Sequence, residues 1–312
     1  MTCDPKKQPI FSVIIPAHNE EEYIAQVLDS IYAQDFPIVA IEIIVINDNS
    51  TDKTLEIVDE YAANKRDESI NVIKILNIKK GSAAGARNAG VMAARGKYVV
   101  FQDADCIADS CLLNNALKKL EDLNLDGVAT RTTNVKPANW LQHAVAVQRA
   151  MRWENTYKSP IIKFLDKDSG INVGIMKRSV VNKLNGFDES IFYYEDNDLT
   201  RRFFEEGFSA VFAPDVIQYH NDPISLKESL GQCASIAKGF HIRMKKGRHL
   251  TFLEWVSLWS GIIPLLNLLS FIAIWITGYN RTRDFKGSFY LGVLWELRSL
   301  AKLYYFLTRW KV

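Results

Sequence analysis

Two aspartates separated by one residue, Asp103 and Asp105, directly follow an apolar run in the segment YVVFQDADC. In an extended segment, side chains two positions apart point the same way, so the two carboxylates face one direction. Unpaired, they would repel each other, and a divalent cation that prefers oxygen ligands, Mg²⁺ or Mn²⁺, removes that repulsion. A pair of this kind on a solvated turn would need no ligand. Its place after a buried strand favours the metal site.

Two further polar clusters follow apolar runs. The first is PAHNE, from Pro16 to Glu20 with His18 at its centre, and the second is NDNSTD, which contains Asp48. Either cluster alone could be a helix cap or a turn, because Asn, Asp and Ser favour both. In an open α/β sheet, however, ligands bind beyond the carboxyl ends of the strands. Three polar clusters in this position predict a ligand site at one edge of a sheet.

Small residues fill the segment KGSAAGARNAG, from Lys80 to Gly90. They could let a phosphate or a base approach the backbone closely, and Arg87 within the segment can make a bidentate contact to a polar ligand. The segment is neither a GxGxxG fingerprint nor a P-loop, because it has no Gly-Lys-Ser/Thr. Packing of a small-residue helix against a sheet explains most of the alanines equally well.

An acidic pair, Glu195 and Asp196, is predicted to open a helix that continues to about Glu206. Acidic residues in a first turn are favoured by the helix dipole, so simple capping is one interpretation. The functional interpretation is a carboxylate that removes a proton from an acceptor. His220 follows the run Ala210–Tyr219 and could complete a metal shell through a ring nitrogen, although a lone histidine is more often structural.

The elements that must position these residues alternate along the first ~220 residues, which is typical of βαβ units. The strands are rich in Val and Ile and scarcely alternate with polar residues, as expected when helices cover both faces of a sheet. We therefore expect an α/β fold with a Rossmann-like, mostly parallel sheet. Strands are predicted at Ile10–Ile15, Ile41–Ile46, Asn71–Leu76 and Tyr98–Phe101. Helices are predicted over roughly Glu20–Ala33, Asp52–Ala63 and Ala83–Ala94, and from about Asp109.

Composition excludes several classes of protein. The 312 residues include 38 Lys and Arg against 36 Asp and Glu, and 48% of them are hydrophobic. These values exclude a disordered chain, and the near-neutral charge argues against a nucleic-acid partner. The four cysteines form no CxxC pair, which fits inert thiols in a reducing compartment. The N-terminus has no long apolar region followed by a cleavage site, so we expect a cytoplasmic location for most of the chain.

The last ~60 residues differ from the rest. Trp255–Thr277 is a run of 23 residues without charge, long enough for a bilayer span, and tryptophans flank it. Pro264 and Asn267 leave a re-entrant or surface-lying helix open, and a buried core helix is the remaining alternative. The basic segment Lys238–Arg248 precedes it, and Ser288–Trp310 reads as a surface helix or a poor second span. We expect a catalytic domain at 1–224, a basic juxtamembrane segment at 225–250 and membrane-associated helices at 251–312.

The order and spacing of PAHNE, NDNSTD, GSAAGARNAG, DAD and YYEDNDLTRR, over roughly residues 10–220, resemble the inverting glycosyltransferases of family two, which have the GT-A fold. The resemblance implies a nucleoside diphosphate sugar as donor. It assigns nucleotide-sugar binding to Pro16, His18, Glu20, Asp48, Arg87, Asp103 and Glu195. It makes Asp105 a ligand of Mg²⁺ or Mn²⁺, with His220 as a further candidate, and makes Asp196 the general base.

One departure from the family pattern narrows the expected activity. The QxxRW motif of processive synthases is absent, since Gln232 begins QCAS, and this argues against processive polymerisation. The expected reaction moves a sugar from a UDP- or GDP-sugar to a hydroxyl on a lipid-linked or cell-surface glycan, at the cell membrane with the catalytic domain in the cytoplasm. A polyprenyl-phosphate sugar synthase is one alternative, disfavoured because an ionised phosphate needs no strong base. A non-catalytic membrane-associated scaffold is the other.

Overall fold

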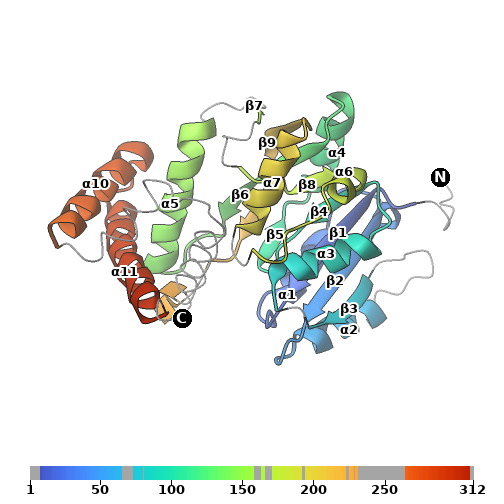
Figure 1. Ribbon diagram of the computed structural model, residues 1–312, viewed down its shortest axis with the longest axis horizontal. Coiled ribbons are helices and arrows are strands. Elements are labelled where there is room, and N and C mark those ends of the chain that lie inside the picture. The colour runs from blue at the N-terminus through green and yellow to red at the C-terminus, as the bar shows by residue number, and fades with distance from the viewer. Residues whose placement is uncertain are drawn as a thin grey trace. The chain divides into compact units, whose positions relative to one another are not determined.

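The computed structural model describes residues 8–64, 73–79, 81–157, 163–165, 171–191, 194–222, 225–227, 229–230 and 264–309. The chain forms two compact units (Figure 1). Unit 1 comprises Met1–Thr132, Pro160–Ser190 and Glu195–Asn221, and unit 2 comprises Thr133–Ser159, Ile191–Tyr194 and Asp222–Val312. The units are therefore interleaved along the chain, and 133–159 belongs with the C-terminal unit although it lies inside the range 1–224.

Four parallel strands form one half of the sheet in unit 1, in the order β3-β2-β1-β4. They are β1 (Phe11–Ala17), β2 (Ile41–Asp48), β3 (Ile73–Ile78) and β4 (Tyr98–Phe101). Each was predicted within a few residues of its bounds. Every residue of β2 is buried, because helices cover both faces of this half of the sheet. The strand register pairs Ala17 with Asn47, which brings the polar residues after β1 and β2 to the same edge.

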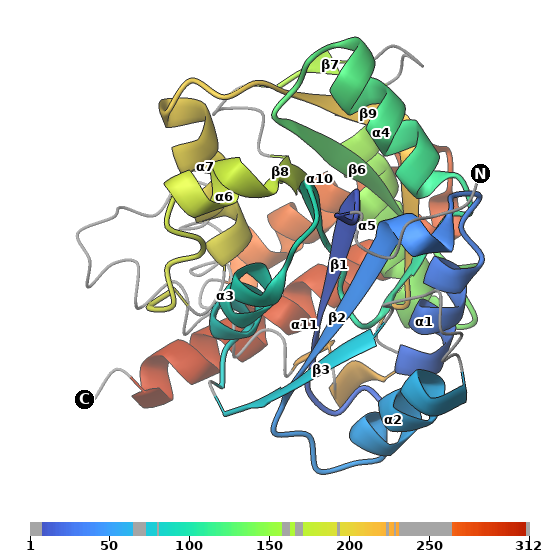
Figure 2. The same cartoon turned by 90° about the vertical axis from the view of Figure 1, so that its right-hand side faces the viewer.

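Helices pack on both faces of this sheet (Figure 2). One core lies between the sheet and α1 (Ile24–Tyr32), α2 (Thr54–Asn64) and α4 (Leu112–Asp122). The opposite core holds α3 (Ala83–Ala93), α6 (Arg178–Lys183) and α7 (Glu195–Glu205). Successive residues of β1 point to opposite faces of the sheet. Val13 and Ile15 pack in the first core, and Ile14 packs in the second. A short 3₁₀ turn, η1 (Ile38–Ala40), leads into β2.

The other half of the sheet is antiparallel, so the expectation of a mostly parallel sheet is wrong. The sheet, which has nine strands among the described residues, is mixed. Its strands are β5 (Cys106–Ala108), β6 (Gly127–Asn134), β7 (Lys163–Phe164), β8 (Ile175–Lys177) and β9 (Ala210–His220). The sheet order continues from β4 through β8, β6 and β9 to β5, and β7 pairs with β9. An apolar run indicates a buried strand without fixing its direction, and two of these strands have only three residues.

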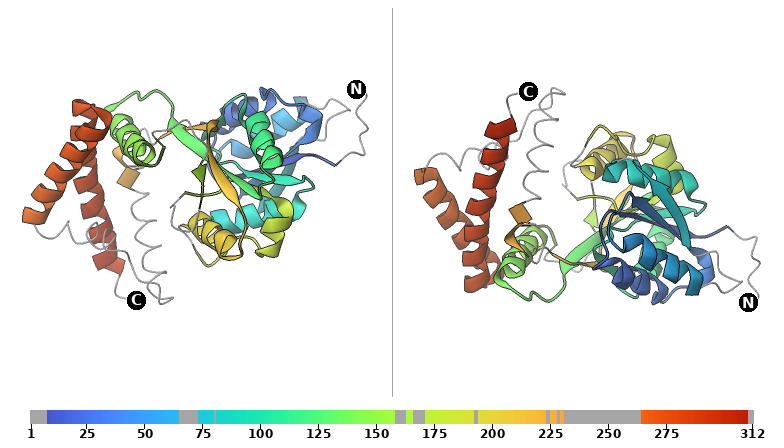
Figure 3. Two further views of the ribbon diagram at one scale, coloured as in Figure 1. Left: turned by 90° about the horizontal axis from the view of Figure 1, so that it is seen from above. Right: turned by 90° about the horizontal axis from the view of Figure 1, so that it is seen from below.

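Unit 2 is helical. Helices α5 (Trp140–Tyr157), α10 (Pro264–Thr282) and α11 (Phe285–Arg309) pack against one another (Figure 3, green and red). Their shared core contains Leu141, Ala144 and Val147 of α5 with Leu291 and Leu294 of α11. Buried Asp222, the first residue of the unit's last segment, accepts from Arg149 at 2.7 Å.

The predicted span Trp255–Thr277 lies partly outside the described residues, which resume at Pro264 with α10. Most of the basic segment 225–250 also lies outside them. The apolar stretch Ser288–Trp310, predicted as a surface helix or a poor second span, lies in α11 except for Trp310, which is outside the described residues; α11 packs on α5 and α10. Within the part of the chain that the structure describes, no helix is both long and apolar enough to cross a bilayer.

Candidate active site

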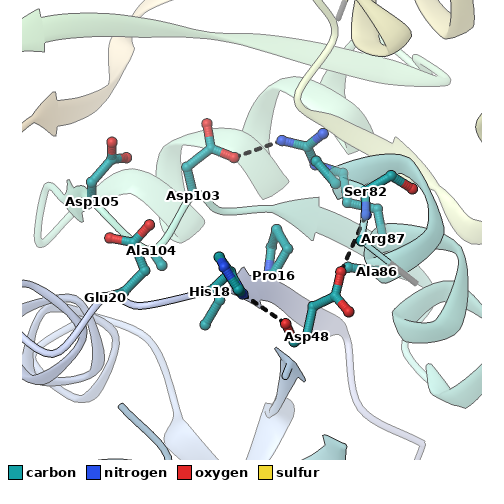
Figure 4. A pocket seen from close by; sticks show the side chains of 13 residues that line it. Pro16, His18, Glu20, Asp48, Ser82, Ala86, Arg87, Asp103, Ala104 and Asp105 are labelled. Carbon is teal, nitrogen blue, oxygen red and sulfur yellow. Dashed lines mark hydrogen bonds and ion pairs between the residues drawn. The ribbon is translucent and has the colours of Figure 1, made fainter. Parts of the chain in front are cut away.

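A cavity of about 450 Å³ opens beyond the carboxyl ends of β1, β2 and β4 (Figure 4). Seven of the ten residues proposed from the sequence line it: Pro16, His18, Glu20, Asp48, Arg87, Asp103 and Asp105. The remaining lining residues are small, namely Ala17, Gly81, Ser82, Ala83, Ala86 and Ala104. The cavity thus combines a charged rim with close access to the backbone at the start of α3.

One end of the cavity is held together by His18, Asp48 and Ser82. His18 donates through Nδ1 to the carbonyl oxygen of Asp48 at 2.7 Å, which ties the ends of β1 and β2 together. The backbone N–H of Ser82 donates to Oδ2 of Asp48 at 3.2 Å. Gly81 precedes it with a φ of +66°, a conformation that disfavours side chains. Ser82 then caps α3 by accepting from the N–H of Gly85 at 3.2 Å. These contacts fix the small-residue loop beside Asp48.

Arg87 of α3 joins two acidic residues from different elements. Its Nη2 lies 2.7 Å from Oδ1 of Asp103 after β4, and its Nη1 lies 2.5 Å from Oε1 of Glu195 at the start of α7. Burial alone would lower the pKa of Arg87, but the carboxylates of Asp103 and Glu195 raise it above its ordinary value. Glu195 does not line the cavity and reaches it through this ion pair. The Asp103 side chain stays about half exposed, at 49%.

The acidic end of the cavity contains Asp105 and Glu20 (Figure 4). Nε2 of His220 lies 3.4 Å from Oδ2 of Asp105, because β5 and β9 pair Cys106 with His220. Burial raises the pKa of Asp105, and His220 counteracts this. Burial and the charges of Asp105 and Asp103 raise the pKa of Glu20 to about 7. The pKa of Glu20 therefore depends on the charges of Asp103 and Asp105.

The donor atoms of Asp105, Cys106 and His220 lie within 4.8 Å of one another. A carboxylate and an imidazole are suitable ligands for Mn²⁺, and a carboxylate with water suits Mg²⁺. Oxygen-preferring cations do not select a thiol, so the usable set is Asp105 and His220. The residues present fit a divalent cation at the open, acidic end of the cavity. The sequence predicted only an inert thiol at Cys106 and did not indicate that this residue lies next to the candidate metal site.

Asp196 lies in the first turn of α7 and is not part of the cavity lining. Burial and the adjacent charge of Glu195 raise its pKa to about 6, and Arg87 opposes the increase. Its Oδ1 accepts from the N–H of Asn197 at 2.8 Å, and its Oδ2 accepts from Nδ2 of Asn172. A carboxyl group of this pKa is mostly ionised at neutral pH and can still accept a proton. Sequence reasoning missed Asn172, which belongs to no recognisable motif.

A mixed α/β sheet with a polar cavity beyond the carboxyl ends of its parallel strands is the arrangement of α/β enzymes that bind ligands at those ends. The model of the family "Glycosyl transferase family 2" matches residues 12–183. The chain belongs to this family, and the predicted enzyme class, a family 2 glycosyltransferase, is confirmed.

Curated relatives resemble parts of the chain. The chain is 30% identical over 250 residues to the "Probable glycosyltransferase YdaM" of Bacillus subtilis. This match covers 75% of this chain and 56% of that protein. It is 35% identical over 116 residues to the "Poly(ribitol-phosphate) beta-N-acetylglucosaminyltransferase TarS" of Staphylococcus aureus, covering 37% of this chain and 20% of that protein. The chain therefore spans little more than half the length of the first relative and less of the second.

Two solved structures share the fold. The mannosyltransferase PcManGT of Pyrobaculum calidifontis, in complex with GDP-Man and Mn²⁺, has a TM-score of 0.62 at 20% identity, over 96% of this chain and 89% of that chain. S. aureus TarS 1–349 in complex with UDP has a TM-score of 0.54 at 19% identity, over 92% and 90%. The predicted α/β GT-A architecture is confirmed at the level of the fold.

Proposed function

We propose that the protein transfers a sugar from a UDP- or GDP-sugar to a hydroxyl group on a lipid-linked or cell-surface glycan, with inversion at the anomeric carbon. The observation that carries the proposal is the cavity itself, where Asp48, Arg87, Asp103 and Asp105 gather beyond three parallel strands. Its volume of about 450 Å³ suits a small-molecule ligand. The UDP and GDP-Man complexes of the structural neighbours are consistent with such a donor.

The donor's nucleoside is proposed to bind at the end formed by Pro16, His18 and Asp48. The His18–Asp48 contact and the Ser82 N–H that donates to Asp48 hold Asp48 in place, so its carboxylate can recognise donor groups of the base or ribose. The small residues at the start of α3 leave room for the diphosphate. Arg87 is ion-paired with Asp103 and Glu195, so its role is to orient these carboxylates toward the sugar nucleotide. Glu20, whose charged neighbours are Asp105 and Asp103, is proposed to contribute to nucleotide-sugar binding from the acidic end of the cavity.

Asp105 and His220 are proposed to hold Mg²⁺ or Mn²⁺ at the other end of the cavity. When bound, the cation supplies positive charge that stabilises the leaving nucleoside diphosphate. The protein's own contribution is to bring Asp105 and His220 within 3.4 Å through the pairing of β5 with β9. The Asn221 N–H also donates to the carbonyl oxygen of Asp105 at 2.9 Å and fixes the backbone just before β5.

Asp196 is proposed as the general base. Attack with inversion requires a hydroxyl that loses its proton on the face of the sugar opposite the leaving group. A raised pKa of about 6 keeps Asp196 ionised at neutral pH while making it a better proton acceptor than an ordinary aspartate. This supports a hydroxyl acceptor over an ionised phosphate, which would need no base.

Membrane association at the cytoplasmic face is also proposed, through an exposed apolar patch on α10 and α11. We define the patch by residues that are between 37% and 61% exposed, namely Ile272, Ile276, Tyr279, Phe285 and Phe289. Trp275 of α10 contacts α11 within this region, since its ring centroid lies 5.2 Å from that of Phe285. Exposed Arg283 and Lys286 flank the patch and complement anionic headgroups. Aromatic rings beside cations are suited to the membrane interface.

The decisive experiment measures nucleotide release by the full chain from UDP-glucose, UDP-N-acetylglucosamine and GDP-mannose, each with Mn²⁺, with ADP-glucose as the control. We expect slow hydrolysis of at least one uridine or guanosine donor and none of the control. Calorimetry with UDP and GDP, with and without Mn²⁺, separates the alternatives. Metal-dependent binding without turnover of any donor would favour a scaffold, and the absence of both would contradict the proposal.

A further inference from the structure

We propose that Asn172 is a positioning residue that orients the carboxylate of Asp196 and stabilises its ionised form. The proposal rests on the function proposed for Asp196. It concerns a residue that precedes the short strand β8 and comes from a different part of the chain than α7.

The contact is specific for the amide group. Nδ2 of Asn172 donates to Oδ2 of Asp196, while the N–H of Asn197 occupies Oδ1. Each carboxylate oxygen therefore has one fixed donor and one lone pair left for a proton. Oδ1 of Asn172 is buried and has no hydrogen-bond partner among the described residues. Of the two polar atoms of this side chain, only Nδ2 has a hydrogen-bond partner among the described residues, so the contact to Asp196 decides the orientation of the amide.

The backbone around Asn172 is anchored to the same helix. The N–H of Val173 donates to Oγ1 of Thr200 at 3.1 Å, and Thr200 is buried. Thr200 lies four residues after Asp196 and thus on the same face of α7. On the other side, the carbonyl oxygen of Gly174 accepts from the N–H of Phe101 in β4 at 2.9 Å. Asn172 is held between the central sheet and the helix that carries the proposed base.

The charged residues around Asp196 determine how loss of the Asn172 amide would affect its ionisation. Glu195 and Asp103 disfavour the ionised form of Asp196, whereas Arg87 favours it from α3. Arg87 is itself paired with Glu195 and Asp103, which limits its help to Asp196. Among the described residues, the Asn172 amide is thus the side-chain donor that contacts the carboxylate directly. Without it, the carboxylate loses a hydrogen bond to its charged form and takes up a proton at higher pH.

The test uses the full chain and the best hydrolysed donor among UDP-N-acetylglucosamine, UDP-glucose and GDP-mannose, with Mn²⁺. In Asn172→Ala we expect the acidic limb of the kcat profile to move up by about one pH unit, the size of effect typical for a hydrogen bond to a charged group. Asn172→Asp keeps the shape and adds a like charge, so its limb should move further. The dissociation constant of UDP or GDP with Mn²⁺ should stay within about twofold of wild type.

The control is Asn115→Ala, which removes an amide that donates at 2.7 Å to the carbonyl oxygen of Asp215, outside the cavity lining. Its profile should match wild type. If both Asn172 variants keep the wild-type limb while Asp196→Asn loses turnover, the positioning role is refuted and the proposed function stands. If Asp196→Asn retains turnover, the proposed function itself fails. Should Asn172→Ala not fold, the isosteric Asn172→Asp carries the test alone.

Discussion

Asp105 is central to the proposed metal site, because its carboxylate lies beside the other proposed ligand, His220. We predict that Asp105→Ala abolishes the Mn²⁺-dependent part of UDP or GDP binding and leaves the weak metal-independent part. Removing one of two protein ligands takes away the charged oxygen that a hard cation prefers. Calorimetry with and without Mn²⁺ measures this. Wild-type affinity in the presence of Mn²⁺ would remove Asp105 from the site.

Asp196→Asn tests the base separately. The amide keeps the shape and cannot accept the proton, so turnover should fall by at least about a hundredfold, within the ~10²–10⁴-fold typical of general-base catalysis. Nucleotide binding should be nearly unchanged, because Asp196 is not part of the cavity lining. Steady-state kinetics and calorimetry give the two quantities. Unchanged turnover would leave Asp196 as a helix-capping residue only.

The pH dependence follows from the same carboxyl group. Burial and Glu195 raise the pKa of Asp196 to about 6, and only the ionised form can act as a base. Activity should therefore be full well above pH 6 and fall about tenfold per pH unit below it. Rates of donor hydrolysis between pH 5 and 8 test this, provided that Mn²⁺ is saturating at each pH. A limb near pH 4 would mean that the catalytic group is an unshifted carboxylate.

At the scale of elements, α3 depends on a glycine to reach the sheet. A Cβ atom on Gly90 would overlap Cγ2 of Ile14 and lie only 2.9 Å from Cδ1 of Ile46. We expect Gly90→Ala to destabilise unit 1 by about 1–3 kcal/mol, the usual effect of overpacking, which is roughly 2–12 °C in melting temperature. Met92→Ala, on the exposed side of the same helix, is the control and should change little. An unchanged melting temperature for Gly90→Ala would show that α3 can shift freely.

The elements also show where sequence reasoning succeeds. The four parallel strands and their helices were predictable because long Val- and Ile-rich runs alternate with amphipathic segments. The cavity was predictable for the same reason, since His18, Asp48 and Asp103 each follow such a run and parallel strands end at one edge. The antiparallel half was not, because an apolar run does not reveal the direction of its strand, and three-residue strands such as Ile175–Lys177 have no detectable period. The Asn172–Asp196 contact depends on pairing between distant segments, which no local pattern encodes.

At the scale of the whole molecule, the exposed patch on α10 and α11 governs the proposed membrane association. We predict that the full chain sediments with vesicles containing phosphatidylglycerol and much less with neutral phosphatidylcholine, because Arg283 and Lys286 flank the patch. Replacing both Phe285 and Phe289 by Glu should abolish sedimentation by adding negative charge and removing apolar area. Met92→Glu introduces the same acid at a residue that is 88% exposed in unit 1 and should bind as wild type. Equal binding of all variants would exclude the patch.

The position of β4 in the mixed sheet has a consequence for synthesis of the chain on the ribosome. Its partner β1 is made before it, but its other partner, β8, begins at Ile175, which is 74 residues beyond Phe101. At about 5–20 residues per second, translation needs roughly 4–15 s to cover that distance. During this interval the parallel half can assemble while one side of β4 still presents unpaired backbone N–H and C=O groups. Arrival of β8 closes that edge, so pausing within the intervening codons would lengthen the time in which a neighbouring nascent chain can compete for it.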